Sequence, residues 1–105
     1  MTEPLSAPSE PTRVIERVQT GVRMEKRMVK VLKGLAEYHD LSLGELLEGI
    51  VLHAFANRPP FSLDTLQRIE QLKQVYGMEY DVAMSHRLTE DAASQPEARA
   101  HQKGV

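Results

Sequence analysis

Basic side chains are concentrated in one part of this 105-residue chain, and phosphate binding is the chemistry that they could perform. Between Pro11 and Gly34 the sequence has seven Lys or Arg residues and two Glu, a net charge of +5, although the whole chain carries −2. The seven are Arg13, Arg17, Arg23, Lys26, Arg27, Lys30 and Lys33. A basic leading part joined to an acidic trailing part indicates polyanion binding, with a solvated helix surface as the alternative interpretation.

The remaining reactive residue types form no recognisable catalytic or metal-binding pattern. The chain has no cysteine, which excludes disulfides, zinc–thiolate sites and thiol nucleophiles. The four histidines are not spaced as a helical metal pair, and Glu45 and Glu48 suit a solvated helix surface. No nucleophile–base pair or glycine-rich phosphate loop stands out. We therefore expect no enzymatic activity, no metal and no cofactor. The histidines are His39, His53, His86 and His101.

The two ends of the chain are poor in large apolar side chains, so residues 1–12 and 89–105 are predicted to be disordered tails. The roughly 70 residues between them are few for a self-sufficient core, and we expect a homodimer. No signal peptide and no apolar run of about 20 residues is visible, so a cytoplasmic protein without a membrane span is expected.

Residues 13–24 alternate between apolar and polar types, which predicts a short half-buried strand. Val18, Thr20, Val22 and Met24 would share one side of this strand, and Arg17, Gln19, Gly21 and Arg23 the other. Because no second strand follows in the sequence, the expected partner is the same strand of a second copy, antiparallel across a two-fold axis.

Two amphipathic helices are predicted next, over 25–38 and 43–55. The first has a poor start, since Met24 occupies the position where a capping residue is expected, and Gly34 suggests close packing. Asp40 interrupts the helical period as a tolerable left-handed residue. Ser42 followed three residues later by Glu45 predicts a capping box at the start of the second helix. The apolar face of that helix is broad enough to need a further covering element.

A third helix is predicted from the Ser62 cap to about Tyr76, with Gly77 as its stop. It would cover the second helix or extend the dimer interface. Residues 78–88 are consistent with either alternation or a loop. The expected organisation is a domain over 13–57, a helical extension over 58–88, and the two tails.

Strand, helix, turn and helix at these lengths resemble the ribbon-helix-helix family of bacterial DNA-binding proteins, with the Arc-type repressor closest in spacing. The resemblance covers residues 19–55. It rests on the alternation in 19–24, on Ala36-Glu37, on Ser42, and on Leu47, Val51 and Phe55 along the second helix. It implies a mainly α fold with one strand that pairs between the two copies of a homodimer, which can assemble further on DNA.

The resemblance implies a transcriptional regulator, a repressor by analogy, whose two-stranded ribbon enters the major groove of double-stranded DNA. By position, the base-reading residues would be Gln19, Gly21 and Arg23. The phosphate-binding residues would be Arg17, Lys26, Arg27, Leu41, Ser42 and Leu43, with backbone amides acting at the last three. Because Gly21 has no side chain, the alternative is a dimer that serves as an antitoxin-like or adaptor module and holds a protein partner through its C-terminal region.

Overall fold

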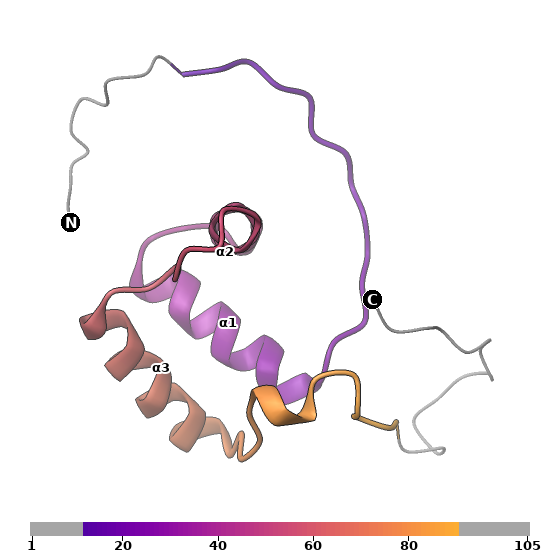
Figure 1. Ribbon diagram of the computed structural model, residues 1–105, viewed down its shortest axis with the longest axis vertical. Coiled ribbons are helices and arrows are strands. Elements are labelled where there is room, and N and C mark those ends of the chain that lie inside the picture. The colour runs from indigo at the N-terminus through magenta and orange to yellow at the C-terminus, as the bar shows by residue number, and fades with distance from the viewer. Residues whose placement is uncertain (1–11, 91–105) are drawn as a thin grey trace.

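The computed structural model describes residues 12–90, which form three α-helices and one short 3₁₀ turn (Figure 1). The helices are α1 (Lys26–Tyr38), α2 (Leu43–Phe55) and α3 (Leu63–Tyr76), and the turn η1 (Val82–Met84) follows α3. Across residues 12–90, no helix has both the length and the apolar character that a bilayer span requires. Apart from residues 12, 89 and 90, the predicted tails lie outside the described residues.

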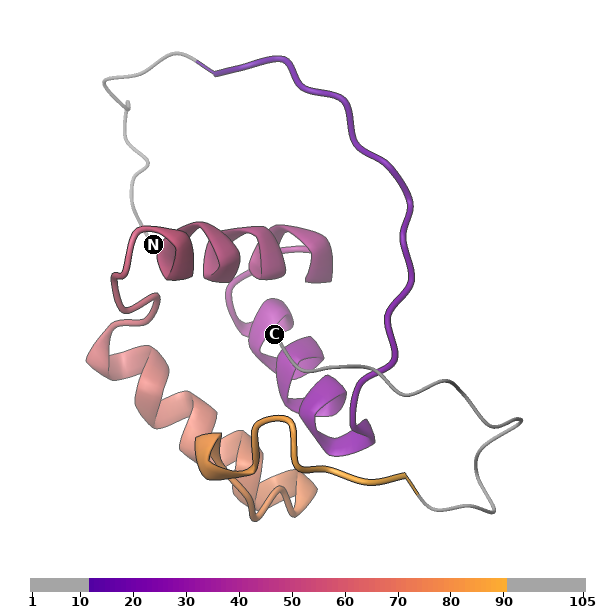
Figure 2. The ribbon, with the colours of Figure 1, turned by 45° about the vertical axis from the view of Figure 1, so that its right-hand side comes forward.

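The α1 helix is the centre of the arrangement. Both α2 and α3 pack against α1, and they do not pack against each other. Figure 2 shows α2 crossing near one end of α1, while α3 runs down its other side and η1 returns toward the start of α1. This corrects the prediction that the third helix covers the second, because the third helix packs on the first and leaves the second largely uncovered.

The predicted ribbon-helix-helix fold class is wrong in its strand, although the chain is mainly helical as expected. Residues 12–25 precede α1 without strand structure, and none of the described residues forms a strand. The residues before α1 follow a long path away from the helices (Figure 1). A strand requires a neighbouring backbone for its ladder of hydrogen bonds, and no described segment pairs with this one in such a ladder.

Local capping explains where each helix begins and ends. The predicted capping box is confirmed: Ser42 Oγ accepts from Glu45 N at 3.1 Å, and Glu45 Oε1 accepts from Ser42 N at 2.9 Å. Ser62 caps α3, and Gly77 ends it in the left-handed conformation with φ 71°. The α1 helix is capped after all, since the Glu25 carboxylate accepts from Met28 N. Asp40 has the predicted positive φ, 57°.

The described core is small and lies where α1 meets the other two helices. Leu35 is 1% exposed and packs with Ala36 and Leu46, which are also buried. Partly buried side chains from all three helices and from the α2–α3 connection surround them: Leu32, Ile50, Phe61, Ile69 and Leu72. The close approach expected at Gly34 is confirmed, because a Cβ there would lie 3.0 Å from Leu72 Cδ2.

The α2 helix is apolar in sequence but mostly uncovered. Among its large apolar side chains only Leu46 is buried, while Leu52 and Phe55 are 65% and 82% exposed and Val51 is also exposed. Burial of such side chains contributes roughly 1.5–3 kcal/mol each, so an uncovered set on one helix indicates a contact surface.

Candidate nucleic-acid interface

The proposed base-reading residues lie on an exposed segment, the N-terminal arm (residues 12–24). Gln19 and Gly21 are exposed, and so is every other residue of the arm. Its apolar residues are as accessible as its arginines, since Val18 is 81% exposed and Val14 and Val22 are similarly open. The arm therefore presents both charged and apolar side chains to whatever it meets.

Arg17 returns from the arm to α2, where it forms a bidentate ion pair with Glu48. The distances are 3.0 Å from Nε to Oε2 and 2.8 Å from Nη2 to Oε1. The hydrogen bond from this guanidinium lowers the pKa of the Glu48 carboxyl. Both side chains are about half exposed or more, and such pairs are worth little in water. A phosphate could therefore replace the Glu48 carboxylate at Arg17.

Arg23, the second arginine with a predicted role, forms an ion pair with Glu90 at the end of the described chain. This contact brings the arm beside the segment that follows η1. Within residues 12–90, the two arginines of the arm that were predicted to contact DNA thus have carboxylate partners from distant parts of the chain.

The start of α1 continues the basic surface of the arm. Lys26, Lys30 and Lys33 are exposed at helical spacings of four and three residues, so they share one face, the α1 lysine stripe. Lys30 lies over the ring of Tyr76, 5.7 Å from its centroid. Arg27 has a more structural position, because it donates to the Gly77 carbonyl at 2.9 Å and pairs with Glu25 at 3.3 Å.

Glu25 links the start of α1 to the segment after α3. The Tyr80 hydroxyl donates to Glu25 Oε1 at 2.6 Å. Partial burial alone would raise the pKa of Glu25, but hydrogen bonds from Tyr80, from the amides of Arg27 and Met28 and from the Arg27 guanidinium outweigh it and lower the pKa to about 2. Burial and the same hydrogen bond raise the pKa of Tyr80 to about 12.

This network predicts a loss of stability in acid that depends on Tyr80. A carboxyl whose pKa is lowered on folding stabilises the folded state above its ordinary value of 4.5, and the contribution disappears as the pH falls toward 2. We expect the loss for the wild type to be about 1–2 kcal/mol. Tyr80→Phe should reduce it, and urea unfolding at pH 7, 4 and 2.5 measures both proteins. Equal pH dependence in the two proteins would contradict this assignment.

The last set of residues predicted to bind phosphate is Leu41, Ser42 and Leu43. This set lies at the opposite end of α1 from Lys26 and Arg27. A helix of 13 residues is about 20 Å long, so one phosphate cannot contact both groups. Ser42 Oγ is engaged in its cap, and the Leu41 amide donates to the Ala36 carbonyl. The neighbouring carboxylates of Asp40 and Glu45 further disfavour an anion at this end.

Sequence reasoning missed the ion pair of Arg17 with Glu48 and the contact of Tyr80 with Glu25. The residues of the first pair are 31 positions apart in the sequence, and those of the second pair are 55 apart, so neither pair has a local signal. In the described part of the chain no group of three or more His, Asp or Glu side chains is placed to hold a metal ion.

Comparison with known proteins adds no relative, since no protein-family model, curated protein or solved structure matches this chain.

Proposed function

We propose that this protein is a cytoplasmic DNA-binding regulator that contacts double-stranded DNA through the N-terminal arm and the α1 lysine stripe and acts as a homodimer. The observation that carries the proposal is the continuity of these two surfaces. Exposed arginines on the arm lead directly into exposed lysines on one face of α1. Several Lys and Arg side chains on one surface match the regular negative charge of a phosphate backbone.

The mechanism begins with electrostatic attraction and ends with exchange of ion pairs. Lys26 and Lys33 form no ion pair among the described residues, so phosphates can bind them directly. At Arg17 and Arg23, a phosphate replaces the carboxylates of Glu48 and Glu90. Gln19 lies between these arginines and can offer its amide to a base edge, where Gln pairs with adenine.

The first test is fluorescence anisotropy with a labelled random duplex and with the DNA upstream of the protein's own coding sequence, at 50 and 200 mM salt. With roughly four phosphate contacts per chain, about eight for the homodimer, affinity should fall by roughly 10⁴-fold over this range. Preference for the upstream DNA would support autoregulation. A folded protein that binds neither duplex at the lower salt would contradict the proposed function.

A matched pair of double variants locates the surface. Lys26→Gln with Lys33→Gln should weaken the salt dependence of binding. The plot of log affinity against log salt should become less steep by about one unit for each phosphate that the chain no longer neutralises. Arg58→Gln with Arg87→Gln removes the same charge from exposed positions outside the basic surface and should leave this slope unchanged. If the two pairs weaken binding equally, net charge and not the α1 lysine stripe determines affinity.

The homodimer is supported by the exposed apolar side chains of α2, and a second copy is the occupant that we propose for them. Leu52→Ser with Phe55→Ser should shift the protein to monomers in sedimentation velocity, by more than about 100-fold in dissociation constant. The single chain should stay folded, because both side chains are already largely exposed. The control is Leu63→Ser with Val75→Ser, which changes two equally exposed residues of α3.

A further inference from the structure

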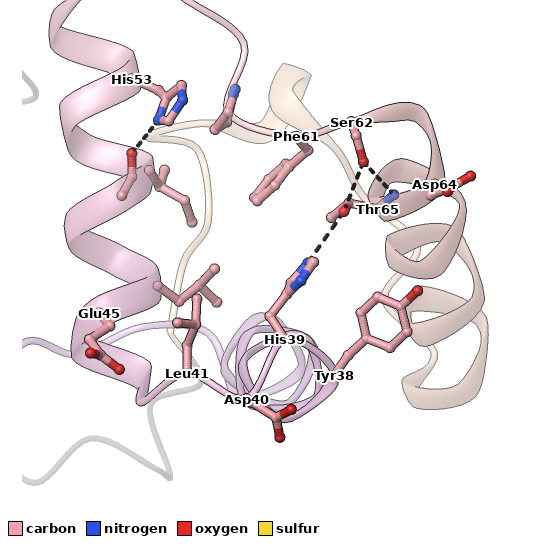
Figure 3. Close-up of a pocket in the computed structure, with 14 residues that line it drawn as sticks. Tyr38, His39, Asp40, Leu41, Glu45, His53, Phe61, Ser62, Asp64 and Thr65 are labelled. Carbon is pink, nitrogen blue, oxygen red and sulfur yellow. Dashed lines mark hydrogen bonds between the residues drawn. The ribbon is translucent and has the colours of Figure 1, made fainter. Parts of the chain in front are cut away.

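Between α2 and α3 lies a hollow of about 1030 Å³, the α2–α3 groove, bounded at one end by the residues that follow α1. It exists because α2 and α3 both pack on α1 but not on each other. Figure 3 shows Phe61 pointing into this space from the α2–α3 connection and His39 reaching into it from the end of α1. The groove is large enough to hold a short peptide segment.

The floor of the groove is apolar. Leu41, Leu46, Ile50 and Phe61 line it, and Leu41 is exposed at its mouth. The two histidines of the lining are engaged locally: His39 Nε2 lies 3.3 Å from Thr65 Oγ1, and His53 Nδ1 lies 2.7 Å from the Gly49 carbonyl oxygen. Apolar side chains of an incoming segment could therefore be covered here without displacing a charged group.

The margin of the groove is acidic. Asp40, Glu45 and Asp64 line it, and the lining contains no Lys or Arg. In Figure 3 Asp40 and Asp64 point outward, away from the space that Phe61 enters, and Glu45 lies at the start of α2. The guanidinium of Arg68 stacks on one lining residue, 4.4 Å from the ring centroid of Tyr38. An apolar floor with an acidic margin suits a segment that is both apolar and basic.

The N-terminal arm has this composition and is uncovered. Its valines at 14, 18 and 22 are spaced by four residues and are all strongly exposed, and Arg13, Arg17 and Arg23 stand beside them. We propose that the N-terminal arm of a second copy docks in the α2–α3 groove, with its valines on the floor and its guanidinium groups at the acidic margin. Reciprocal docking of two arms in two grooves gives a closed, two-fold assembly.

A second copy is favoured over the chain's own arm because the arm of this chain lies outside the groove. Every residue of the arm is exposed, and none of them lines the groove. Arg17 is also held by Glu48, which is not part of the groove lining. The inference rests on the proposed homodimer, and because the arginines of the arm serve both contacts, a docked arm and a DNA-bound arm are alternative states.

Cysteine cross-linking of the full chain tests the docking directly, because the sequence has no cysteine of its own. A Val18→Cys chain is mixed with a Leu41→Cys chain of different mass and oxidised gently. The mixed disulfide should form at least about tenfold faster than with a Glu79→Cys chain, since docking raises the local thiol concentration. Glu79 is exposed and lies outside the groove.

Charge complementarity is tested by adding Asp40→Asn and Asp64→Asn to the Leu41→Cys chain, which should slow the cross-link several-fold. Asparagine tolerates the positive φ of Asp40. Equal rates for Leu41→Cys and Glu79→Cys would overturn the proposal. So would a fast intrachain disulfide on monomers of a Val18→Cys, Leu41→Cys chain. Sedimentation separates the failures, because a dimer without the cross-link refutes arm docking alone and a monomer refutes the homodimer as well.

Discussion

Replacing Arg13, Arg17 and Arg23 together by glutamine is expected to cause the largest loss of DNA binding available without unfolding the protein. The three arginines lie on the exposed arm and are not part of the buried core. If each contacts one phosphate, the slope of log affinity against log salt should fall by about three per chain. Anisotropy titrations from 50 to 200 mM salt measure that slope, and thermal unfolding of the variant should match that of the wild type.

The ion pair between Arg17 and Glu48 provides the opposite control for this experiment. Glu48→Gln removes the carboxylate that competes with phosphate for Arg17, so DNA affinity should rise two- to fivefold at low salt, within the range of an exposed ion pair. A decrease in affinity would mean that Glu48 positions Arg17 for the DNA instead of competing with it.

Leu35→Ala is expected to cause the largest loss of stability. Leu35 is 1% exposed and lies at the centre of the core, where neighbouring side chains on α1, α2 and α3 meet. Truncating such a leucine removes apolar burial and leaves a cavity, at a cost of about 3 kcal/mol. For a domain of this size the melting temperature should fall by roughly 10–20 °C.

Circular dichroism during heating or urea titration measures this effect. The matched control is Val75→Ala on α3, an exposed position where truncation should change the free energy of unfolding by less than about 0.5 kcal/mol. A similar loss in both variants would show that the core does not lie around Leu35.

Helix positions were predictable because their signals are local. The bounds of α2 follow from the Ser42–Glu45 capping box and an uninterrupted apolar period, and α3 follows from Ser62 and Gly77 in the same way. The cap of α1 was missed because glutamate is an uncommon capping residue, and its role at Glu25 depends partly on the distant Tyr80.

The predictions that were wrong or incomplete concern features that depend on a neighbouring segment of the structure. Alternation in residues 13–24 describes side-chain preference, but a strand exists only where another backbone pairs with it. The apolar stripe of α3 likewise does not state which helix it faces, and Gly34 opposite Leu72 gives α3 a close fit on α1. For the predicted site, the sequence identified the basic residues but not the carboxylates that Arg17 and Arg23 contact.

Among the helices, α2 packs on α1 alone, and this sets the order in which parts of the molecule open. With one buried side chain of its own, Leu46, α2 has fewer anchors than α1, whose Val31, Leu35 and Ala36 are all buried. In a single chain, α2 can therefore detach while α1 and α3 stay together, and its amide protons should exchange with solvent sooner than theirs. A partner that covers α2 would prevent this detachment and slow the exchange of its amide protons. The exchange rate of these protons therefore reports what fraction of the protein is assembled.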